Sequence, residues 1–133
     1  MFAYQTTVKM HDTDAAGILF FGNQFKMVHD AYEGFLESID FSFAKLIRKT
    51  NFFLPIVHAE ADYKTKLFVG DQITIYCSVS RIGRTSFTMS YKLLNGRKKV
   101  VGLAKTVHVS VNAQTYQKIP LPPKLRKILI KKE

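Results

Sequence analysis

The chain has 133 residues, an apolar fraction of 47% and a formal net charge of +10. This length predicts a single domain over residues 1–133, and this apolar fraction excludes a disordered chain, because it is enough to build a core. No run approaches 18 uninterrupted apolar residues, and the N-terminus lacks the pattern of a secretory signal. We therefore expect a cytoplasmic protein without a membrane span.

The basic charge lies mostly in the second half of the chain. Residues 72–132 contain thirteen Lys and Arg and no Asp or Glu. Such asymmetry is typical of a protein with a polyanionic partner, either nucleic acid or a phosphorylated cofactor such as coenzyme A. A solvated basic surface is the alternative. The single cysteine, Cys77, allows no internal disulfide and is expected to be a small buried side chain.

The first part of the chain predicts one strand and one long helix. Residues 3–10 have a strand-like alternation, and a loop with two acids, Asp12 and Asp14, follows. From Asn23, which we expect to cap the helix, apolar residues recur at helical spacing for about four turns. Ser42 is expected to cap a second, short helix over residues 43–50.

The rest of the chain predicts antiparallel strands. The extended segments are 52–68, 72–82, 85–94 and 97–112, and a Pro-rich turn and a basic amphipathic tail follow them. Asn95-Gly96 predicts a type I′ hairpin turn, and Gly102 predicts a bulge.

Alternation also predicts which side chains share a face. In the last strand these are Val101, Leu103, Val107, Val109 and Val111. In the segment after Pro55 they are Ile56, His58, Glu60 and Asp62.

One long helix beside an antiparallel sheet predicts an α+β domain in which the sheet wraps around the helix. A single helix covers a sheet only partly, so an edge strand is left exposed. We expect two copies of the chain to pair through such edges.

The loop before the helix is the candidate site. A carboxylate near a helix start lies close to free backbone N–H groups and a positive partial charge. Small residues, Ala15 to Gly17, let a ligand approach. Asp14 is therefore either a catalytic acid or a simple turn residue, whereas Asp12 is expected to order the loop.

The four histidines are weaker candidates. His29 and Glu33 are four residues apart on the helix and form either a surface pair or part of a pocket. His58 follows an apolar run and is either a core residue or a pocket residue. His11 and His108 have no partner visible in the sequence. No two histidines combine with a Cys or an acid in a convincing ligand set, so we predict no metal.

The order of elements resembles the hotdog fold, and the run from Asp12 to Phe21 resembles the Asp-x-Asp-x-x-Gly motif of 4-hydroxybenzoyl-CoA thioesterase-like enzymes. The resemblance spans nearly the whole chain, since the run LPIVHA at 54–59 and Gly70-Asp71 also fit. Within the family, that run and the helix segment from Asn23 look closest to the 1,4-dihydroxy-2-naphthoyl-CoA thioesterases. Those enzymes act in phylloquinone and menaquinone synthesis.

The resemblance implies roles for individual residues. Asp14 is the catalytic nucleophile or general base, and the backbone N–H of Phe21 polarises the thioester carbonyl. Gly22, His29 and His58 are assigned to the same oxyanion and substrate site. The CoA phosphates are assigned to Arg81, Arg84 and Thr85 near a strand turn, a stretch with fewer adjacent cations than in some relatives.

The resemblance therefore implies an acyl-CoA thioesterase for an aromatic acyl group, most concretely 1,4-dihydroxy-2-naphthoyl-CoA, in a dimer or tetramer. Coenzyme A is part of the substrate, and no separate cofactor is expected. The alternatives are a broad-range acyl-CoA or acyl-carrier-protein thioesterase, and a hotdog protein that binds a CoA ester without cleaving it. A basic nucleic-acid-binding module is not favoured, because the long helix carries Asp30, Glu33 and Glu37.

Overall fold

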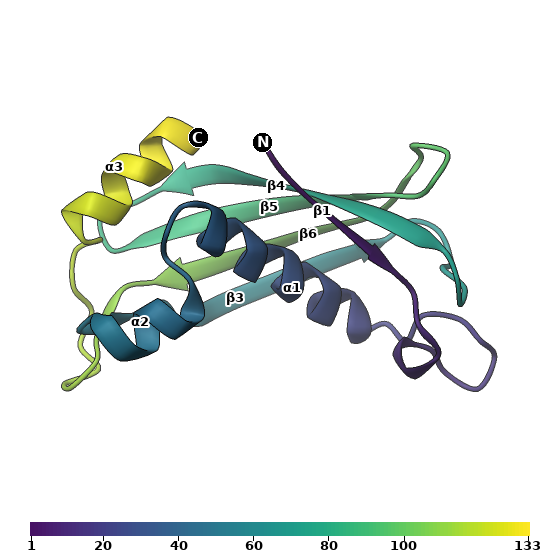
Figure 1. Cartoon of the computed structure of the whole chain (residues 1–133), viewed down its shortest axis with the longest axis horizontal. Helices are drawn as coiled ribbons and strands as arrows, with labels where there is room; N and C mark the ends of the chain where they lie inside the picture. Colours follow the sequence, from purple (N-terminus) through teal and green to yellow (C-terminus); the bar gives the residue numbers. More distant parts are fainter.

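A five-stranded antiparallel sheet, in the order β1-β4-β5-β6-β3, lies against the long helix α1 (Figure 1). The computed structural model describes the backbone of residues 1–133 and every side chain except that of Lys49. The strands of this sheet are β1 (Phe2–Thr7), β3 (Ile56–Tyr63), β4 (Gln72–Ile82), β5 (Ser86–Leu94) and β6 (Val100–Val109). The predicted α+β architecture, with a sheet around one long helix, is confirmed.

The remaining elements lie around this sheet. They are the 3₁₀ helix η1 (Met10–Asp12), the helices α1 (Asn23–Ser38), α2 (Phe43–Lys49) and α3 (Pro123–Lys132), and a second sheet of β2 (Phe52–Phe53) and β7 (Val111–Asn112). Helix α3 buries Leu125 and Leu129, and it contacts β4. Among the described residues, no helix combines the length and the apolar character that a membrane crossing needs.

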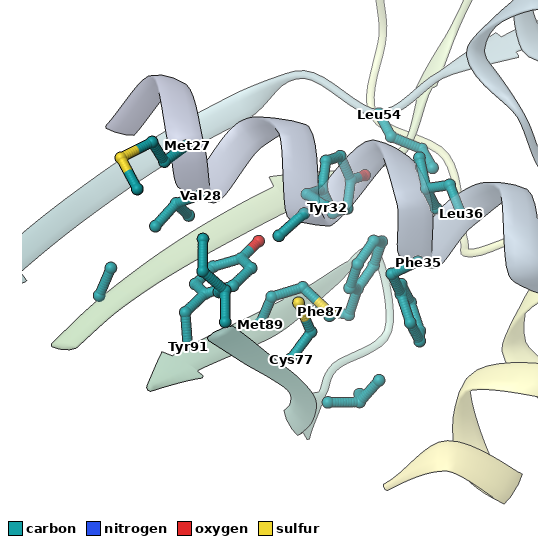
Figure 2. Packing of buried hydrophobic residues seen from close by; sticks show 14 of the residues in the cluster. Met27, Val28, Tyr32, Phe35, Leu36, Leu54, Cys77, Phe87, Met89 and Tyr91 are labelled. Atoms are coloured by element: carbon teal, nitrogen blue, oxygen red, sulfur yellow. The ribbon is translucent and has the colours of Figure 1, made fainter. Parts of the chain in front are cut away.

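The core lies between α1 and the inner face of the sheet (Figure 2). The helix contributes Met27, Val28, Ala31, Tyr32, Phe35 and Leu36, which recur on one face at helical spacing. Strands β4 and β5 contribute alternate residues, as predicted: Ile73, Ile75, Cys77 and Val79, and Phe87, Met89, Tyr91 and Leu93. Burial raises the pKa of the Cys77 thiol to about 12, so this side chain is a small core residue and not a thiolate.

The start of α1 differs from the prediction. Gly22, not Asn23, precedes the first helical residue, and no side chain caps the helix. The Asn23 amide instead donates a hydrogen bond to the Asp12 carbonyl oxygen at 2.8 Å. The predicted Asn23 cap is therefore wrong, because its side chain fastens the helix start to the acid loop. Ser42 caps α2 as predicted, accepting from the Lys45 N–H at 3.2 Å.

A buried glutamine joins the first turn of α1 to the sheet. Gln24 is only 1% exposed, and its amide donates to the carbonyl oxygens of Asp62, at 3.3 Å, and Leu103, at 3.2 Å. Gly102 lies directly against this amide, since a Cβ at position 102 would lie 2.9–3.1 Å from it. The absence of a side chain at Gly102 therefore lets the Gln24 amide approach the β6 backbone this closely.

The predicted bulge at Gly102 is confirmed, and it changes which residues of β6 face the helix. Leu93 pairs with Gly102 and Leu94 with Val100, so Val101 is an extra residue. One extra residue inverts the alternation that follows it. The prediction that Leu103 and Val107 share an inner face with Val101 is therefore wrong. The side chains that face the helix are those of Ala104, Thr106 and His108.

A second bulge corrects the face assignment of β3. The pairing with β6 shifts between Ile56 and His58, so Ile56 does not lie on the same face as His58. The predicted exposed edge is confirmed: β3 is the last strand of the sheet, and seven of its eight residues are exposed. Val57 is 60% exposed on this edge.

The β5–β6 hairpin has a different turn from the predicted type I′. Lys98, with φ of 61°, takes the left-handed conformation, and its N–H donates to the Asn95 carbonyl oxygen at 2.9 Å. The Asn95 side chain accepts from the N–H groups of Arg97 and Lys99. Asn95 therefore organises the start of the turn, and Lys98 supplies the left-handed residue that was expected at Asn95-Gly96.

Candidate active site

Asp14 is held in an exposed tight turn. Its Oδ1 accepts from the N–H of Ala16 at 2.8 Å and, more weakly, from that of Ile18 at 3.4 Å. The Asp14 N–H in turn donates to the Ile18 carbonyl oxygen at 2.9 Å, and Gly17 closes the turn with φ of 74°. The Asp14 Oδ2 accepts no hydrogen bond from the described residues. One carboxylate oxygen therefore fixes the orientation of the group and leaves the other available for chemistry.

Asp12 has a different environment from Asp14. It is 4% exposed, and burial by itself would raise the pKa of its carboxyl. The Lys9 N–H, at 2.9 Å, and the Lys26 ammonium, at 3.0 Å, outweigh burial and hold the pKa below its usual value. The Asp12 carbonyl oxygen also accepts from the Phe20 N–H. Asp12 therefore orders the loop.

Asp12→Asn should lower the free energy of unfolding at pH 7 by about 1–3 kcal/mol, because it removes a buried charge that accepts from the Lys9 N–H and the Lys26 ammonium. The folded state holds the Asp12 pKa below its value of about 3.9 in the unfolded state, so the charged carboxylate stabilises the fold above pH 3.9. This stabilisation is lost as pH falls through the pKa of the folded state. Urea unfolding at pH 7 and pH 3 should therefore show a difference from wild type that shrinks in acid. Glu37→Gln, on the exposed side of α1, is the control. A pH-independent difference would contradict the role of the charge.

The peptide groups at the start of α1 have unused donors. The N–H of Phe20 donates to Asp12 and that of Asn23 donates to the Phe20 carbonyl oxygen. Phe21 and Gly22 lie between these two residues, and their N–H groups have no acceptor in the described part of the chain. Two adjacent free donors at the positive end of a helix can stabilise a developing oxyanion.

Tyr63 is a site residue that the sequence analysis missed. Its hydroxyl donates to the Phe21 carbonyl oxygen at 2.8 Å, and its ring meets that of Phe21 edge to face, with centroids 6.4 Å apart. The Phe21 carbonyl and the Gly22 N–H belong to one planar trans peptide and point in opposite directions. Tyr63 therefore also orients the Gly22 N–H. The pairing depends on residues 42 positions apart, and no local pattern reveals it.

A cavity of about 310 Å³ begins one turn further along α1, between the helix and the sheet. Its lining residues are Phe25, Lys26, Val28, His29, Tyr32, Ile56, Ala59, Tyr91, Thr106 and His108. His29 both lines this cavity and pairs with Glu33, since its Nδ1 lies 3.2 Å from the Glu33 Oε1. The two interpretations of His29 are therefore compatible.

Three polar side chains form a buried chain of hydrogen bonds on the sheet side of this cavity. The Tyr91 hydroxyl lies 2.8 Å from the Thr106 Oγ1, which lies 2.7 Å from the His108 Nε2. His108 is fully buried, and its ring stacks on that of Tyr32 with centroids 4.1 Å apart. Burial lowers the pKa of His108 to about 4, so the ring is neutral at pH 7.

The buried His108 should make the protein acid-sensitive. The unfolded state binds a proton near pH 6.5, but the folded state does so only near pH 4, so the free energy of unfolding falls as pH drops through this window. The shift corresponds to about 3 kcal/mol. Urea unfolding of wild type and His108→Gln at pH 7, 6, 5 and 4 should show a weaker pH dependence in the variant. His11→Gln, at a histidine with a 66% exposed side chain, is the control, and an unchanged slope in His108→Gln would refute the assignment.

The other predicted site residues lie away from Asp14 within one chain. His58 is on the outer face of the sheet, where its Nε2 lies 3.1 Å from the Glu60 Oε1. Arg81, Arg84 and Thr85 lie at or just beyond the end of β4, whereas the acid loop adjoins its start (Figure 1). Strand β4 has 11 residues, so its two ends lie roughly 33 Å apart.

Two lysines lie nearer to the acid loop. Lys64 and Lys66 line a cavity of about 270 Å³ together with Leu19, Phe21 and Tyr63. Arg84 lies beside other cations at the opposite end, because α3 packs there and the Arg126 guanidinium donates to the Gly83 carbonyl oxygen at 2.7 Å. Among the described side chains, no three His, Cys, Asp or Glu gather closely enough to share a metal ion.

Solved structures with this architecture identify the class. The 1,4-dihydroxy-2-naphthoyl-CoA thioesterase from Synechocystis superposes with a TM-score of 0.90 over 97% of this chain and 95% of that one, at 28% identity. A gentisyl-coenzyme A thioesterase superposes with a TM-score of 0.85 over 93% of this chain and 98% of that one, at 30% identity. The fold is the hotdog fold, as the sequence resemblance implied, and the protein is a thioester hydrolase.

Sequence comparison defines the family. The sequence model of the thioesterase-like superfamily matches residues 8–129, and the chain belongs to this family. A 1,4-dihydroxy-2-naphthoyl-CoA hydrolase of Rippkaea orientalis is 36% identical over 124 residues, which are 92% of this chain and 90% of that protein. The enzyme of the same name in Nostoc punctiforme is 35% identical over 93% of this chain and 83% of that protein.

Proposed function

We propose that this protein hydrolyses an aromatic acyl-CoA thioester, most concretely 1,4-dihydroxy-2-naphthoyl-CoA, in cytoplasmic phylloquinone or menaquinone synthesis. One observation carries the proposal: the Asp14 carboxylate, with one free oxygen, shares a short loop with the free N–H groups of Phe21 and Gly22. The names of the relatives from Rippkaea orientalis and Nostoc punctiforme support the acyl group.

The site supplies what thioester hydrolysis requires. The thioester carbonyl oxygen binds at the N–H groups of Phe21 and Gly22, where negative charge develops. Asp14 either takes a proton from the water that attacks the carbonyl carbon, or attacks that carbon itself to form a mixed anhydride that water then cleaves. The C–S bond breaks and coenzyme A leaves as a thiolate. Because a thiolate is a good leaving group, the reaction needs no strong general acid and no separate cofactor.

The catalytic unit in this proposal is a homodimer joined through β3, either alone or paired into a tetramer. Strand β3 is an edge strand with both faces exposed, and it carries apolar side chains, including Ile56 and Val57. Such an edge is a natural pairing surface. A two-fold axis makes the two β3 strands antiparallel, so the Tyr63 end of one lies beside the Ile56 end of the other.

This arrangement accounts for the distant arginines. Within one chain the Tyr63 end of β3 contacts the acid loop. The Ile56 end pairs with His108 of β6, which in turn pairs with Phe87 next to the β4–β5 turn, so this end of β3 lies at the turn end of the sheet. The two-fold axis therefore brings Arg84 of the partner subunit towards Asp14. In this proposal Arg81, Arg84 and Thr85 of each subunit bind the phosphates of a CoA ester whose thioester lies at Asp14 of the other.

A substrate panel tests the proposal. We expect kcat/KM for 1,4-dihydroxy-2-naphthoyl-CoA to exceed that for 4-hydroxybenzoyl-CoA, gentisyl-CoA and a medium-chain acyl-CoA by about tenfold or more, because one or two extra buried contacts distinguish these acyl groups. Equal values across the panel would indicate a broad-range thioesterase, and a preference for acyl-carrier-protein esters would indicate the carrier as substrate. Binding of these esters without turnover would refute hydrolysis.

A further inference from the structure

The chain of hydrogen bonds beside the cavity has a fixed direction. The His108 Nδ1 faces the Leu54 carbonyl oxygen at 3.5 Å, and a carbonyl oxygen can only accept. In the neutral ring the proton therefore lies on Nδ1, and Nε2 must accept from the Thr106 hydroxyl. Thr106 has then used its only proton, so it accepts the proton of the Tyr91 hydroxyl.

The Tyr91 end of this chain of hydrogen bonds can accept a further hydrogen bond. The Tyr91 hydroxyl donates its proton to Thr106 and retains lone pairs that no other group shares. Figure 2 shows the Tyr91 side chain reaching from the sheet towards α1, with its oxygen directed at the helix. On the helix side, the Tyr32 hydroxyl is fully buried and also has no partner among the described residues. Because buried polar groups are normally hydrogen-bonded, the unused lone pairs of Tyr91 give the sheet side of the cavity one polar position that a ligand donor can fill.

The cavity has the dimensions of a bicyclic aromatic group. A cavity of about 150 Å³ accepts one benzene ring, so the observed 310 Å³ suits two fused rings. Its helix side runs from Phe25 to Tyr32, which is about 6 to 16 Å along the axis from the Phe21 N–H. A thioester bound at that N–H can therefore place its acyl group in this space.

We infer that this cavity is the acyl subsite and that Tyr91 determines its specificity, by accepting a hydrogen bond from a ring hydroxyl of the acyl group. The inference rests on the proposed function and goes beyond it in naming the residue and the polarity that it selects. An acyl group with a donor, such as a naphthol, is favoured. An unsubstituted ring leaves the Tyr91 oxygen unpaired, and a methoxy ring offers it only a second acceptor.

The test compares 4-hydroxy-2-naphthoyl-CoA, 2-naphthoyl-CoA and 4-methoxy-2-naphthoyl-CoA. The 4-hydroxyl lies too far from the thioester carbonyl to bond with it, so any preference reports on the protein. Wild type should favour the hydroxylated ester over the unsubstituted ester about five- to tenfold in kcat/KM. Tyr91→Phe should bring this ratio close to one. Tyr76→Phe, the same change on the outer face of β4, should preserve it.

A second variant should turn the Tyr91 hydroxyl from an acceptor into a donor towards the cavity, instead of removing it. Thr106→Val deletes the acceptor of the Tyr91 proton, and the hydroxyl can then donate into the cavity. The kcat/KM for the methoxy ester, relative to the unsubstituted ester, should therefore rise in Thr106→Val and stay unchanged in Tyr76→Phe. A wild-type ratio near one, or an unchanged ratio in Tyr91→Phe, would overturn the inference.

Binding separates the inference from the proposed function. Wild type that cleaves none of these esters would refute the proposed function. Dissociation constants of the same esters, measured on Asp14→Asn, then decide the inference without turnover. Tighter binding of the hydroxylated ester that disappears in Asp14→Asn/Tyr91→Phe would support it, and equal binding would overturn it.

Discussion

Asp14→Asn should lower kcat by about 10²–10⁴-fold on every thioester that the protein cleaves, with no change in its thermal midpoint. The amide keeps an oxygen that can accept from the Ala16 N–H, so the turn is retained. It has no charge with which to accept a proton or attack a carbonyl. Steady-state kinetics and thermal unfolding of the purified variant measure both parts of this expectation.

Asp12→Asn is the matched control, because the same change is made two residues earlier. It should cost stability, as argued above, and much less activity, because the Asp12 carboxylate binds Lys9 and Lys26 and does not face the substrate. Full activity in Asp14→Asn would refute the proposed mechanism. A loss of kcat in both variants with equal destabilisation would show that loop order, and not Asp14 chemistry, limits the rate.

Mixing two inactive variants should restore activity if the site is shared between subunits. Asp14→Asn lacks the catalytic acid, and Arg84→Glu is expected to lose affinity for the CoA phosphates. In a mixed dimer, one site combines the intact Asp14 of one subunit with the intact Arg84 of the other. Random exchange of equal amounts should therefore restore about a quarter of the wild-type activity at subsaturating substrate.

The control for mixing weakens the proposed interface. Val57→Lys places a charge on the exposed edge of β3, and it should produce monomers in sedimentation experiments. Carried in both mixing partners, it should abolish the recovery. Ile130→Lys introduces the same charge at an exposed position of α3, on a helix that contacts β4, and it should leave the dimer intact. No recovery from mixed dimers of proven composition would refute the shared site.

Local sequence was sufficient where the relevant residues are close together in the chain. Asp14 and Phe21 are seven positions apart, and the loop and helix start that contain them were predicted from small residues and helical periodicity. The inner faces of β4 and β5 were likewise predicted by alternation, because the only register shift between these strands follows Val79. These features depend on local conformation and on a period that the sequence displays directly.

Features that depend on one inserted residue could not be predicted. The extra residue Val101 turns Thr106 and His108 towards the helix, and the alternation of valines had indicated the opposite face. The polar end of the cavity was missed for this reason. Gly102 indicated a bulge, but the number of residues it adds follows from pairing with β5, which the sequence of β6 does not contain.

The position of the arginines could not be predicted for a different reason. The resemblance assigned both Asp14 and Arg84 to one site, and the strands between them fix a separation of roughly 33 Å in a single chain. Sequence comparison reports which residues a family uses, but it does not report which copy of the chain provides them. The path of β4 away from the acid loop is the observation that leads us to propose Arg84 of the partner subunit.

The contact between Gly102 and Gln24 makes one strand position important for how the start of α1 is held against the sheet. The Gln24 amide donates to the Leu103 carbonyl oxygen of β6 and ties the first helical turn to the sheet, three residues after Phe21. A methyl group at position 102 would lie 2.9–3.1 Å from the end of the Gln24 side chain and would displace this amide. A substitution at Gly102 can therefore loosen the helix start that carries the proposed oxyanion donors, although Gly102 itself lies outside the proposed site.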